Sequence, residues 1–518
     1  MSTTAPAQAG PARGLGAEGL LRDPILLGLL AVAFALRLYS ALTITYNWDE
    51  EREWIRVARE ISFDPGALHL PLRSDNHGAL AAYFIHFGAL LFGESPLGYR
   101  FFGLITGTAT IAVVALLARE WTGSRTAALW AAAFVALNEY HTMISVLAIQ
   151  KVYSLLFAAI ALYAFARALR DDQPKWLIPA AIAAAFAVLS YEIMYLLAPI
   201  FGIVVLAMRR AWFANVYVYL AAAIALAILA PDIFWNVGNA GDAERMSYAT
   251  HLERMGGVGV NPHYLLFFFR DAVHVLYGAL GRVLEDEFAE YAAMNSLLGL
   301  VLFLAALAWS WRYISKPQAR ADSVLLLMLT TFWLVFLVFT LMKPGSSERL
   351  DSEGWVWIDL VLLPAAILAG ALIKDLAGAP RLIASGVAAL ALVYAGVDMA
   401  AVRFLPAYSV ALLPESTVEP EAMVSLRPAF NACVLCDKSP QTELIDITHY
   451  PPPHYALTSA FDSGAAVRGQ DGLLHVRNAP GVVYDVTYRL TDRGGNQSVI
   501  RTWVDARSLN YPAPFWAR

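Results

Sequence analysis

Long apolar stretches run through most of this chain and decide what it can fold into. Eleven segments are mostly apolar over close to the 20 or so residues that a helix needs to cross a bilayer. In lipid, backbone N–H and C=O groups must be paired within the protein, so such segments cross as helices. A composition of 58% hydrophobic and 15% charged residues agrees with this interpretation. We therefore predict an α-helical polytopic membrane protein with about eleven transmembrane helices, at residues 24–45, 97–119, 125–143, 151–169, 176–190, 191–208, 212–231, 294–312, 322–342, 354–374 and 382–401.

Basic residues indicate which helix ends face the cytoplasm, because short loops rich in Lys and Arg are retained there. A further apolar segment, residues 78–92, is short for a span, and we interpret it as an interfacial helix. Nearly every short basic loop then falls on the side of residues 1–23, a small, polar tail predicted to be disordered and cytoplasmic. The basic residues concerned are Arg119, Arg125, Arg167, Arg170, Lys175, Arg209, Arg210, Arg312, Lys316, Arg320, Lys374 and Arg381.

This topology describes a multi-pass protein of the cell (inner) membrane, with a transmembrane domain at residues 24–401 and its N-terminus in the cytoplasm. The alternation of loops between the two sides of the membrane depends on segment 176–208. Two short spans with a turn at Tyr191 and Glu192 preserve this alternation, whereas a single tilted helix would break it. The segments predicted to lie outside are the first outer loop 46–96, the turn 144–150, the long outer loop 232–293, the turn 343–353 and residues 402–518.

Residues 402–518 differ in composition from the spans and are predicted to form a small extracytoplasmic, β-rich soluble domain. Residues 482–490 and 498–504 alternate in polarity around a Gly-Gly turn, which predicts a β-hairpin.

The cysteines of this domain have a spacing that resembles a zinc finger. Cys433 and Cys436 are followed by His449 and His454, but three prolines at 451–453 exclude a regular helix carrying both histidines. In an oxidising compartment, nearby thiols tend to form a disulfide. A disulfide or free thiols are therefore the preferred interpretation, and structural zinc is the alternative.

The first outer loop carries a group of charges directly after the first span. Asp49, Arg52 and Arg56 have the spacing of one helical face, and Glu50 follows Asp49. The ordinary interpretation of such a run is a solvated, salt-bridged helix. Its place beside a span, and the later residue His77, favour a functional site at the membrane edge.

An ordered set of short motifs in this region resembles the GT-C glycosyltransferases. The resemblance covers roughly residues 24–210 and is best over 46–170; the relatives are the protein O-mannosyltransferases, the lipid A aminoarabinose transferases and especially the archaeal-type flippase-associated group. The motifs are Trp48-Asp49-Glu50, Ala58-Arg59-Glu60, His77-Gly78, Leu91-Phe92-Gly93-Glu94-Ser95, Arg100, Gly103 and Gly107.

The resemblance implies transfer of a sugar from a polyprenyl-phosphate-linked donor to a lipid, polysaccharide or protein acceptor on the outer face, with inversion. Asp49 would be the base that takes the acceptor's proton, and Glu50 a second carboxylate. Two departures bear on the phosphate site. Lys151 stands where relatives have an acid, which puts a divalent metal in doubt, and His77 begins a segment that in relatives often reads Lys-Pro-Pro.

Cations are needed to hold the leaving phosphate. The candidates are Lys151, Arg52, Arg56, Arg73 and Arg349, whereas His77, also a candidate substrate-binding residue, would orient Asp49 or an acceptor hydroxyl. Each has an alternative. Arg52 and Arg56 would simply pair with Glu53 or Glu60, Lys151 and Arg349 would reach lipid head groups, and His77 would cap a helix.

Two other functions remain as alternatives: a transporter or flippase for lipid-linked sugars, and a non-catalytic assembly protein that binds polyprenyl phosphate. A transporter would place ionisable residues near the bilayer midplane, whereas most charges here lie at span ends. A net charge of −5 gives no basic footprint for nucleic acid, and no phosphate-binding glycine loop supports an ATP-driven process.

Overall fold

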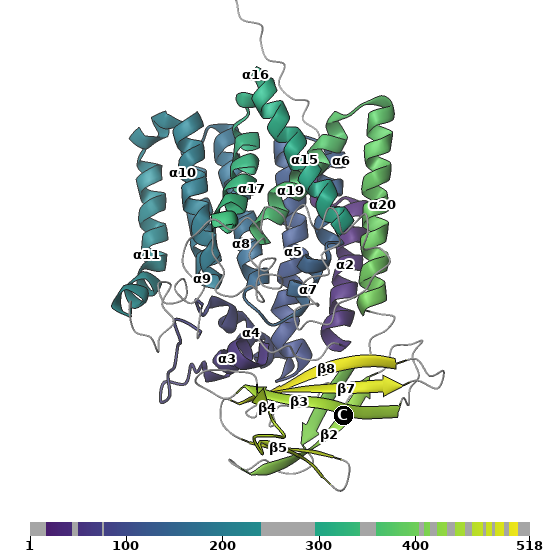
Figure 1. The fold of residues 1–518 in the computed structure, drawn as a ribbon. Coiled ribbons are helices and arrows are strands. Elements are labelled where there is room, and N and C mark those ends of the chain that lie inside the picture. Colours follow the sequence, from purple (N-terminus) through teal and green to yellow (C-terminus); the bar gives the residue numbers. More distant parts are fainter. Residues whose placement is uncertain are drawn as a thin grey trace, which may run out of the picture.

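The computed structural model of this chain joins a helical bundle to a domain of β-strands at one end of the bundle (Figure 1). It describes residues 17–43, 50–74, 77–239, 296–341, 359–403, 409–414, 422–431, 441–450, 458–469, 473–478, 482–491 and 497–505. Six of the described helices are long and apolar enough to cross a membrane. Each of the other predicted spans coincides with a shorter helix, and the total number of spans stays a prediction.

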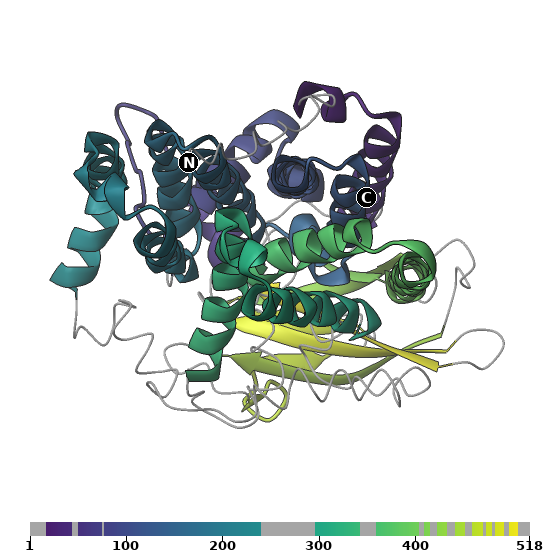
Figure 2. The ribbon, with the colours of Figure 1, turned by 90° about the horizontal axis from the view of Figure 1, so that it is seen from above.

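The long helices of the bundle begin and end close to the predicted boundaries. They are α2 (Pro24–Thr43), α5 (Pro96–Thr122), α6 (Arg125–Ala136), α8 (Lys151–Asp171), α9 (Leu177–Ser190), α10 (Leu197–Met208), α11 (Val216–Gly238), α15 (Ser296–Ser315), α17 (Ser323–Leu341), α19 (Asp359–Asp375) and α20 (Gly378–Arg403). Short helical segments α1 (Ala17–Leu21), η2 (Pro174–Trp176), η4 (Arg210–Ala214) and α16 (Pro317–Arg320) flank or connect them. Seen from above, the helices of residues 296–403 group on one side of the bundle (Figure 2).

Two predicted span boundaries differ from the structure. The predicted span 125–143 is broken after Ala136, because the Asn138 side chain accepts the His141 N–H at 2.8 Å and starts a new helix, α7 (Glu139–Val146). The long outer loop was predicted from residue 232, whereas α11 continues to Gly238 and carries Asp232 inside the helix.

The segment 176–208 is two helices, as the alternation requires. α9 ends at Ser190, and a 3-10 turn, η3 (Glu192–Leu196), separates it from α10. Tyr191 has an extended backbone, with φ of −156° and ψ of 120°, which interrupts the helix.

The first outer loop lies at the same end of the bundle as the β-strands (Figure 1). It forms a π-helical turn, η1 (Glu50–Ile55), then α3 (Arg56–Glu60) and the predicted short helix, here α4 (Leu80–Phe92). The 13 residues of α4 span about 20 Å, too little for a bilayer. One face of α4 is buried and the other exposes Phe87, Leu90, Leu91 and Phe92, as expected of an interfacial helix.

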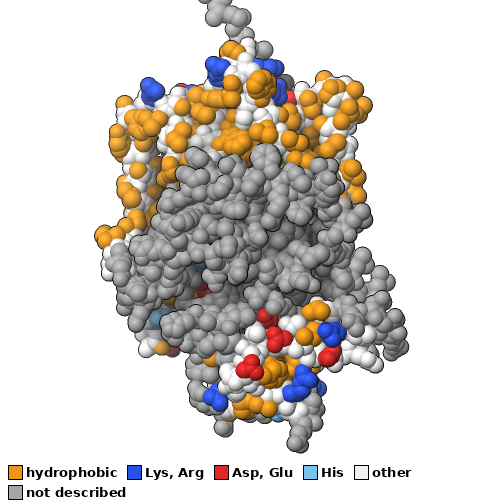
Figure 3. Space-filling view, viewed as in Figure 1, with side chains coloured by type: hydrophobic (Ala, Val, Ile, Leu, Met, Phe, Trp, Pro, Cys, Tyr) orange, Lys and Arg blue, Asp and Glu red, His pale blue; other side chains and the backbone are white. Residues whose placement is uncertain are grey.

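The opposite end of the bundle carries Lys and Arg side chains around α16, and apolar side chains cover the described surface of the bundle next to that end (Figure 3). The first outer loop and the β-strands thus lie on one side and the basic end on the other. This arrangement agrees with the topology expected from charge, and the orientation in the membrane stays a prediction.

The β-strands form two four-stranded sheets that pack face to face, with the orders β1-β2-β6-β5 and β4-β3-β7-β8. Their shared core includes Leu426 and Val476 from one sheet and Ile447, Tyr484 and Val486 from the other. The strands are β1 (Ser409–Pro414), β2 (Met423–Asn431), β3 (Gln441–Tyr450), β4 (Thr458–Ser459), β5 (Ala466–Arg468), β6 (Leu474–Arg477), β7 (Val483–Thr491) and β8 (Gln497–Asp505).

The predicted hairpin is confirmed: β7 and β8 pair antiparallel, with Thr487 opposite Arg501. His449 lies in strand β3, so no zinc-finger helix forms there. Cys433, Cys436 and His454 lie outside the described residues, and their pairing or metal binding stays a prediction.

Candidate active site

Glu50 fixes the start of the first outer loop inside the bundle. Its carboxylate accepts two bonds from Arg100 of α5, from Nε at 2.8 Å and from Nη2 at 2.7 Å. It also accepts the backbone N–H of Ala148 at 2.7 Å, while Arg100 Nη1 donates to the Ala41 carbonyl at 2.7 Å. The Glu50 and Arg100 side chains are both completely buried. Charges removed from water to this extent must be paired. The Glu50–Arg100 pair and its two backbone partners, which we call the Glu50 clamp, join α2, α5, the first outer loop and the segment before α8.

Lys151 is held close to this clamp by the chain itself, because it follows Ala148 by three residues and is the first residue of α8. Lys151 is only 5% exposed. A lysine that reached the head groups would extend into solvent or lipid, so its burial favours a role within the protein. The residue next to Asp49 and the segment leading to Lys151 therefore lie together.

His77 sits in a tight turn of the first outer loop. The Ser74 N–H donates to the His77 carbonyl at 2.8 Å, and the His77 N–H donates to Ser74 Oγ at 3.0 Å. Ser74 Oγ in turn donates to the carboxylate of Glu53 in η1. The His77 ring lies parallel to Trp54, with 5.9 Å between ring centroids, and edge-on to Tyr191 at 5.4 Å. The imidazole is thus fixed on several sides.

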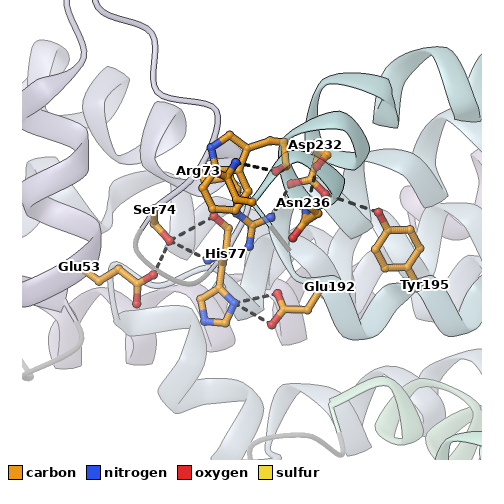
Figure 4. Close-up of polar contacts among 10 residues, drawn as sticks. Glu53, Arg73, Ser74, His77, Glu192, Tyr195, Asp232 and Asn236 are labelled. Carbon is orange, nitrogen blue, oxygen red and sulfur yellow. Dashed lines mark hydrogen bonds and ion pairs between the residues drawn. The ribbon is translucent and has the colours of Figure 1, made fainter. Parts of the chain in front are cut away.

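Glu192 binds His77 from the break between α9 and α10 (Figure 4). Its Oε2 lies 2.7 Å and its Oε1 2.9 Å from His77 Nδ1. Burial lowers the pKa of His77, but the charges of Glu192 and Glu53 and the hydrogen bond to Glu192 outweigh burial and Arg73, so the pKa is raised. The first outer loop is thereby held against η3.

Gly78, directly after His77, lies where the chain passes very close to the backbone of α9. A Cβ atom at Gly78 would collide with the carbonyl group of Leu189, whereas one at Gly66 in the same loop would meet only Asp64 Oδ1 at 3.5 Å. We expect Gly78→Ala to lower the free energy of unfolding by about 1–3 kcal/mol, the usual cost of overpacking. Thermal unfolding of the solubilised chain measures this, with Gly66→Ala as the matched control. Equal stabilities of the two variants would contradict the close packing.

Arg73 anchors the same loop to α11. Its Nη1 lies 2.5 Å from Asp232 Oδ1, and both side chains are almost fully buried. The guanidinium also lies 4.7 Å from the Trp235 ring centroid, and the Tyr195 hydroxyl donates to Asp232 Oδ2 at 3.5 Å. Figure 4 shows this pair beside the His77 turn. Arg73, a predicted phosphate ligand, and His77 are therefore neighbours, and each has an acidic partner.

The other predicted cations are placed differently. Arg56 pairs with Glu60 at 2.8 Å on the exposed side of α3. This is the ion pair expected of Arg56 if it does not bind phosphate. The side chain of Arg52 and all of Asp49 and Arg349 lie outside the described residues. Residues 50–55 form a wider π-helical turn in place of the α-helix that the spacing predicted.

Three buried charged residues of this region were not assigned a role from the sequence: Arg100, Glu192 and Asp232. A signal existed, since an ionisable residue within or beside an apolar stretch is costly in a membrane and needs a partner. Arg37 of α2 belongs to the same class. It donates to the Ala136 carbonyl, where α6 ends, at 3.3 Å and to His141 Nδ1 at 2.9 Å, and so supports the break between α6 and α7.

The described side chains do not fit a divalent metal. Among them, no three His, Cys, Asp or Glu residues gather as a metal-binding group. The buried carboxylates of Glu50, Glu192 and Asp232 are each engaged with a basic side chain.

Comparison with known proteins places this site in a known fold. Residues 76–235 match the family model for dolichyl-phosphate-mannose-protein mannosyltransferase. The structure of ArnT from Cupriavidus metallidurans bound to undecaprenyl phosphate matches with a TM-score of 0.50 and 16% identity, over 70% of this chain and 63% of that one. The apo oligosaccharyltransferase of Archaeoglobus fulgidus matches with a TM-score of 0.42 and 15% identity, over 72% of this chain and 56% of that one.

The chain spans less than two thirds of the length of these solved proteins. No curated protein matches its sequence. The matched residues 76–235 contain His77, Lys151, Glu192 and Asp232, so the family model covers most of the described site. The helical part of this chain has the fold of the GT-C membrane glycosyltransferases.

Proposed function

We propose that this protein is a glycosyltransferase that moves a sugar from a polyprenyl-phosphate-linked donor to an acceptor on the outer face of the membrane. The observation that carries the proposal is the buried Glu50 clamp. It places the residue after Asp49 against the segment that leads to Lys151, at the end of the bundle that also holds Arg73 and His77. In this proposal Asp49, the residue before Glu50, is the base, and the cations are supplied from the same end of the bundle.

The fold supports this choice of ligand. ArnT, whose structure contains bound undecaprenyl phosphate, shares the fold, and a polyprenyl phosphate has one charged head group on a chain that remains in lipid. A site at the end of the helical bundle, near the membrane surface, can receive such a donor from the membrane and an acceptor from water.

The proposed reaction is a single displacement at the anomeric carbon. Asp49 takes the proton of the acceptor hydroxyl, and the acceptor oxygen forms a bond to the anomeric carbon from the face opposite the phosphate. The bond between that carbon and the phosphate oxygen breaks, and its electron pair leaves with the polyprenyl phosphate. The product has the inverted configuration, and the cations stabilise the charge that develops on the leaving phosphate.

A transfer assay with the wild-type chain tests the function. Membranes containing the protein would be supplied with labelled polyprenyl-phosphate hexoses and pentoses, and both the label and the released polyprenyl phosphate would be followed. We expect one donor to be consumed with equal release of polyprenyl phosphate. Movement of an intact donor across the vesicle membrane would identify a transporter. Binding of the donor without its consumption would identify an assembly protein. Either result overturns the proposal.

Lys151 is expected to supply much of the phosphate binding. Lys151→Met keeps a similar shape and removes the charge, and we expect kcat/KM for the donor to fall about 10²-fold, as for loss of one charge-stabilising group. Thermal unfolding of Lys151→Met beside wild type separates loss of donor binding from loss of the fold, because removing one buried charge can also destabilise a protein. The matched control is Lys175→Met, at an exposed lysine in η2. Wild-type kinetics in Lys151→Met would exclude this role.

A further inference from the structure

The His77 imidazole is surrounded by an unusual balance of charges. Glu192 of η3 contacts Nδ1 directly, and Glu53 of η1 accepts from Ser74 Oγ, which itself accepts the His77 backbone N–H. The nearby cation is Arg73, which is itself paired with Asp232 of α11. Tyr191 and Trp54 supply aromatic contacts. Among the described residues, the groups around His77 thus include two acids, a cation paired with another acid, and two aromatic rings. Figure 4 shows Glu53, Glu192 and the Arg73–Asp232 pair in this arrangement.

This environment determines both the position and the charge of the ring. A carboxylate bound to Nδ1 fixes the ring orientation and keeps a proton on that nitrogen. In the protonated imidazole both nitrogens are donors, so Nε2–H points away from Glu192 with the ring carrying a positive charge. A hydrogen bond from a charged donor to a phosphate is roughly twice as strong as one from a neutral donor.

We propose that Glu192 is a positioning residue that keeps the His77 imidazole oriented and protonated, so that His77 acts as a constant cation for the donor's phosphate at the working pH. The inference rests on the proposed function, because that function supplies the phosphate. It goes further by assigning a task to Glu192, a residue in the break between two helices. It also explains why the first outer loop is tied to η3 at this point rather than left mobile.

The direction in which the pKa of His77 changes when Glu192 is replaced follows from the charges that remain around it. Glu192 and Glu53 raise the pKa of His77, whereas burial lowers it. Without the Glu192 charge, burial and Arg73 oppose Glu53 alone, and the pKa falls. The imidazole would then lose its proton at a lower pH. The donor phosphate is a diester and keeps its single charge near neutral pH. A change of KM with pH therefore reflects a group of the protein.

The experiment measures kcat and KM for the donor from about pH 5.5 to pH 9 in the full-length protein. For Glu192→Gln we expect the pH at which KM rises to move down by about one unit or more, which is about a tenfold higher KM near neutral pH. KM should return to the wild-type value at the acidic end. The matched control is Glu94→Gln, which removes an acid paired with Arg59 in the same loop; its profile should superimpose on that of wild type.

A lysine at position 77 separates charge from structure. Because an ammonium group keeps its proton across this range, His77→Lys should give a KM that is independent of pH and unchanged by adding Glu192→Gln. A purely structural role of Glu192 would instead raise KM or lower kcat equally at every pH, with no rescue by lysine. That result, or a Glu192→Gln profile identical to wild type, overturns the inference.

A direct titration keeps the inference testable apart from the function. In protein with labelled histidine, the His77 signal can be assigned by its loss in His77→Gln and followed with pH by NMR. We expect its midpoint above the ordinary histidine value in wild type and lower in Glu192→Gln. If wild type transfers no sugar from any donor, the proposed function fails, whereas an unshifted His77 midpoint refutes the role of Glu192.

Discussion

Glu50→Ala should lower the free energy of unfolding by about 3–5 kcal/mol, the cost of breaking a buried ion pair from one side. The substitution takes two charge-assisted bonds from the buried Arg100 and one acceptor from the Ala148 N–H. It therefore releases both the start of the first outer loop and the segment before α8. Thermal unfolding of the detergent-solubilised chain measures the loss as a fall in Tm.

A double variant and a matched control make this prediction specific. Glu50→Leu combined with Arg100→Met removes both charges together, and it should recover most of the stability that Glu50→Ala loses, since the buried pair no longer needs to be desolvated. Glu60→Ala breaks the exposed pair with Arg56 and should cost no more than about 1 kcal/mol. A Glu50→Ala protein as stable as Glu60→Ala would show that the clamp does not hold the loop.

The clamp also bears on the interpretation of Glu50 as a second catalytic carboxylate. A carboxylate that holds Arg100 and a backbone N–H inside the protein is well suited to fixing its neighbour in place. We therefore expect Glu50 to act mainly by positioning Asp49. Its direct contact with substrate stays a prediction from the sequence.

Much of the fold follows from the sequence because lipid imposes a simple rule on length and polarity. A helix must be about 20 residues long to cross, so the limits of α5 and α8 and the shortness of α4 could be read from apolar runs. The break after Ala136 was missed because a span of about 20 residues tolerates a few polar ones, although Asn138, Glu139 and His141 interrupt the apolar run where the Asn138 cap starts α7. Hydrophobicity does not record where one apolar helix ends and another begins.

The candidate site could be predicted only in part, because its contacts join residues far apart in the chain. Glu50 and Arg100 are 50 positions apart, His77 and Glu192 are 115 apart, and Arg73 and Asp232 are 159 apart. A single sequence shows that such charges lie at span ends but not which of them meet. The packing of α5, α9 and α11 around the first outer loop supplies that information.

Asp49 is the proposed base, and Asp49→Asn tests this role with almost no change in side-chain shape. The amide cannot accept the acceptor's proton, so we expect the rate of transfer to fall about 10²- to 10⁴-fold, the usual contribution of a general base. The phosphate ligands are untouched, so binding of the donor should persist. Asp64→Asn, at an exposed aspartate in the same loop, is the matched control and should keep wild-type rates.

The decisive measurement is the single-turnover rate of sugar transfer from the labelled donor in these two variants and in wild type, each at saturating donor. The account predicts a rate in Asp49→Asn at least about 10²-fold below those of wild type and Asp64→Asn, with donor still bound. Transfer by Asp49→Asn at the wild-type rate would contradict Asp49 as the base and the mechanism built on it.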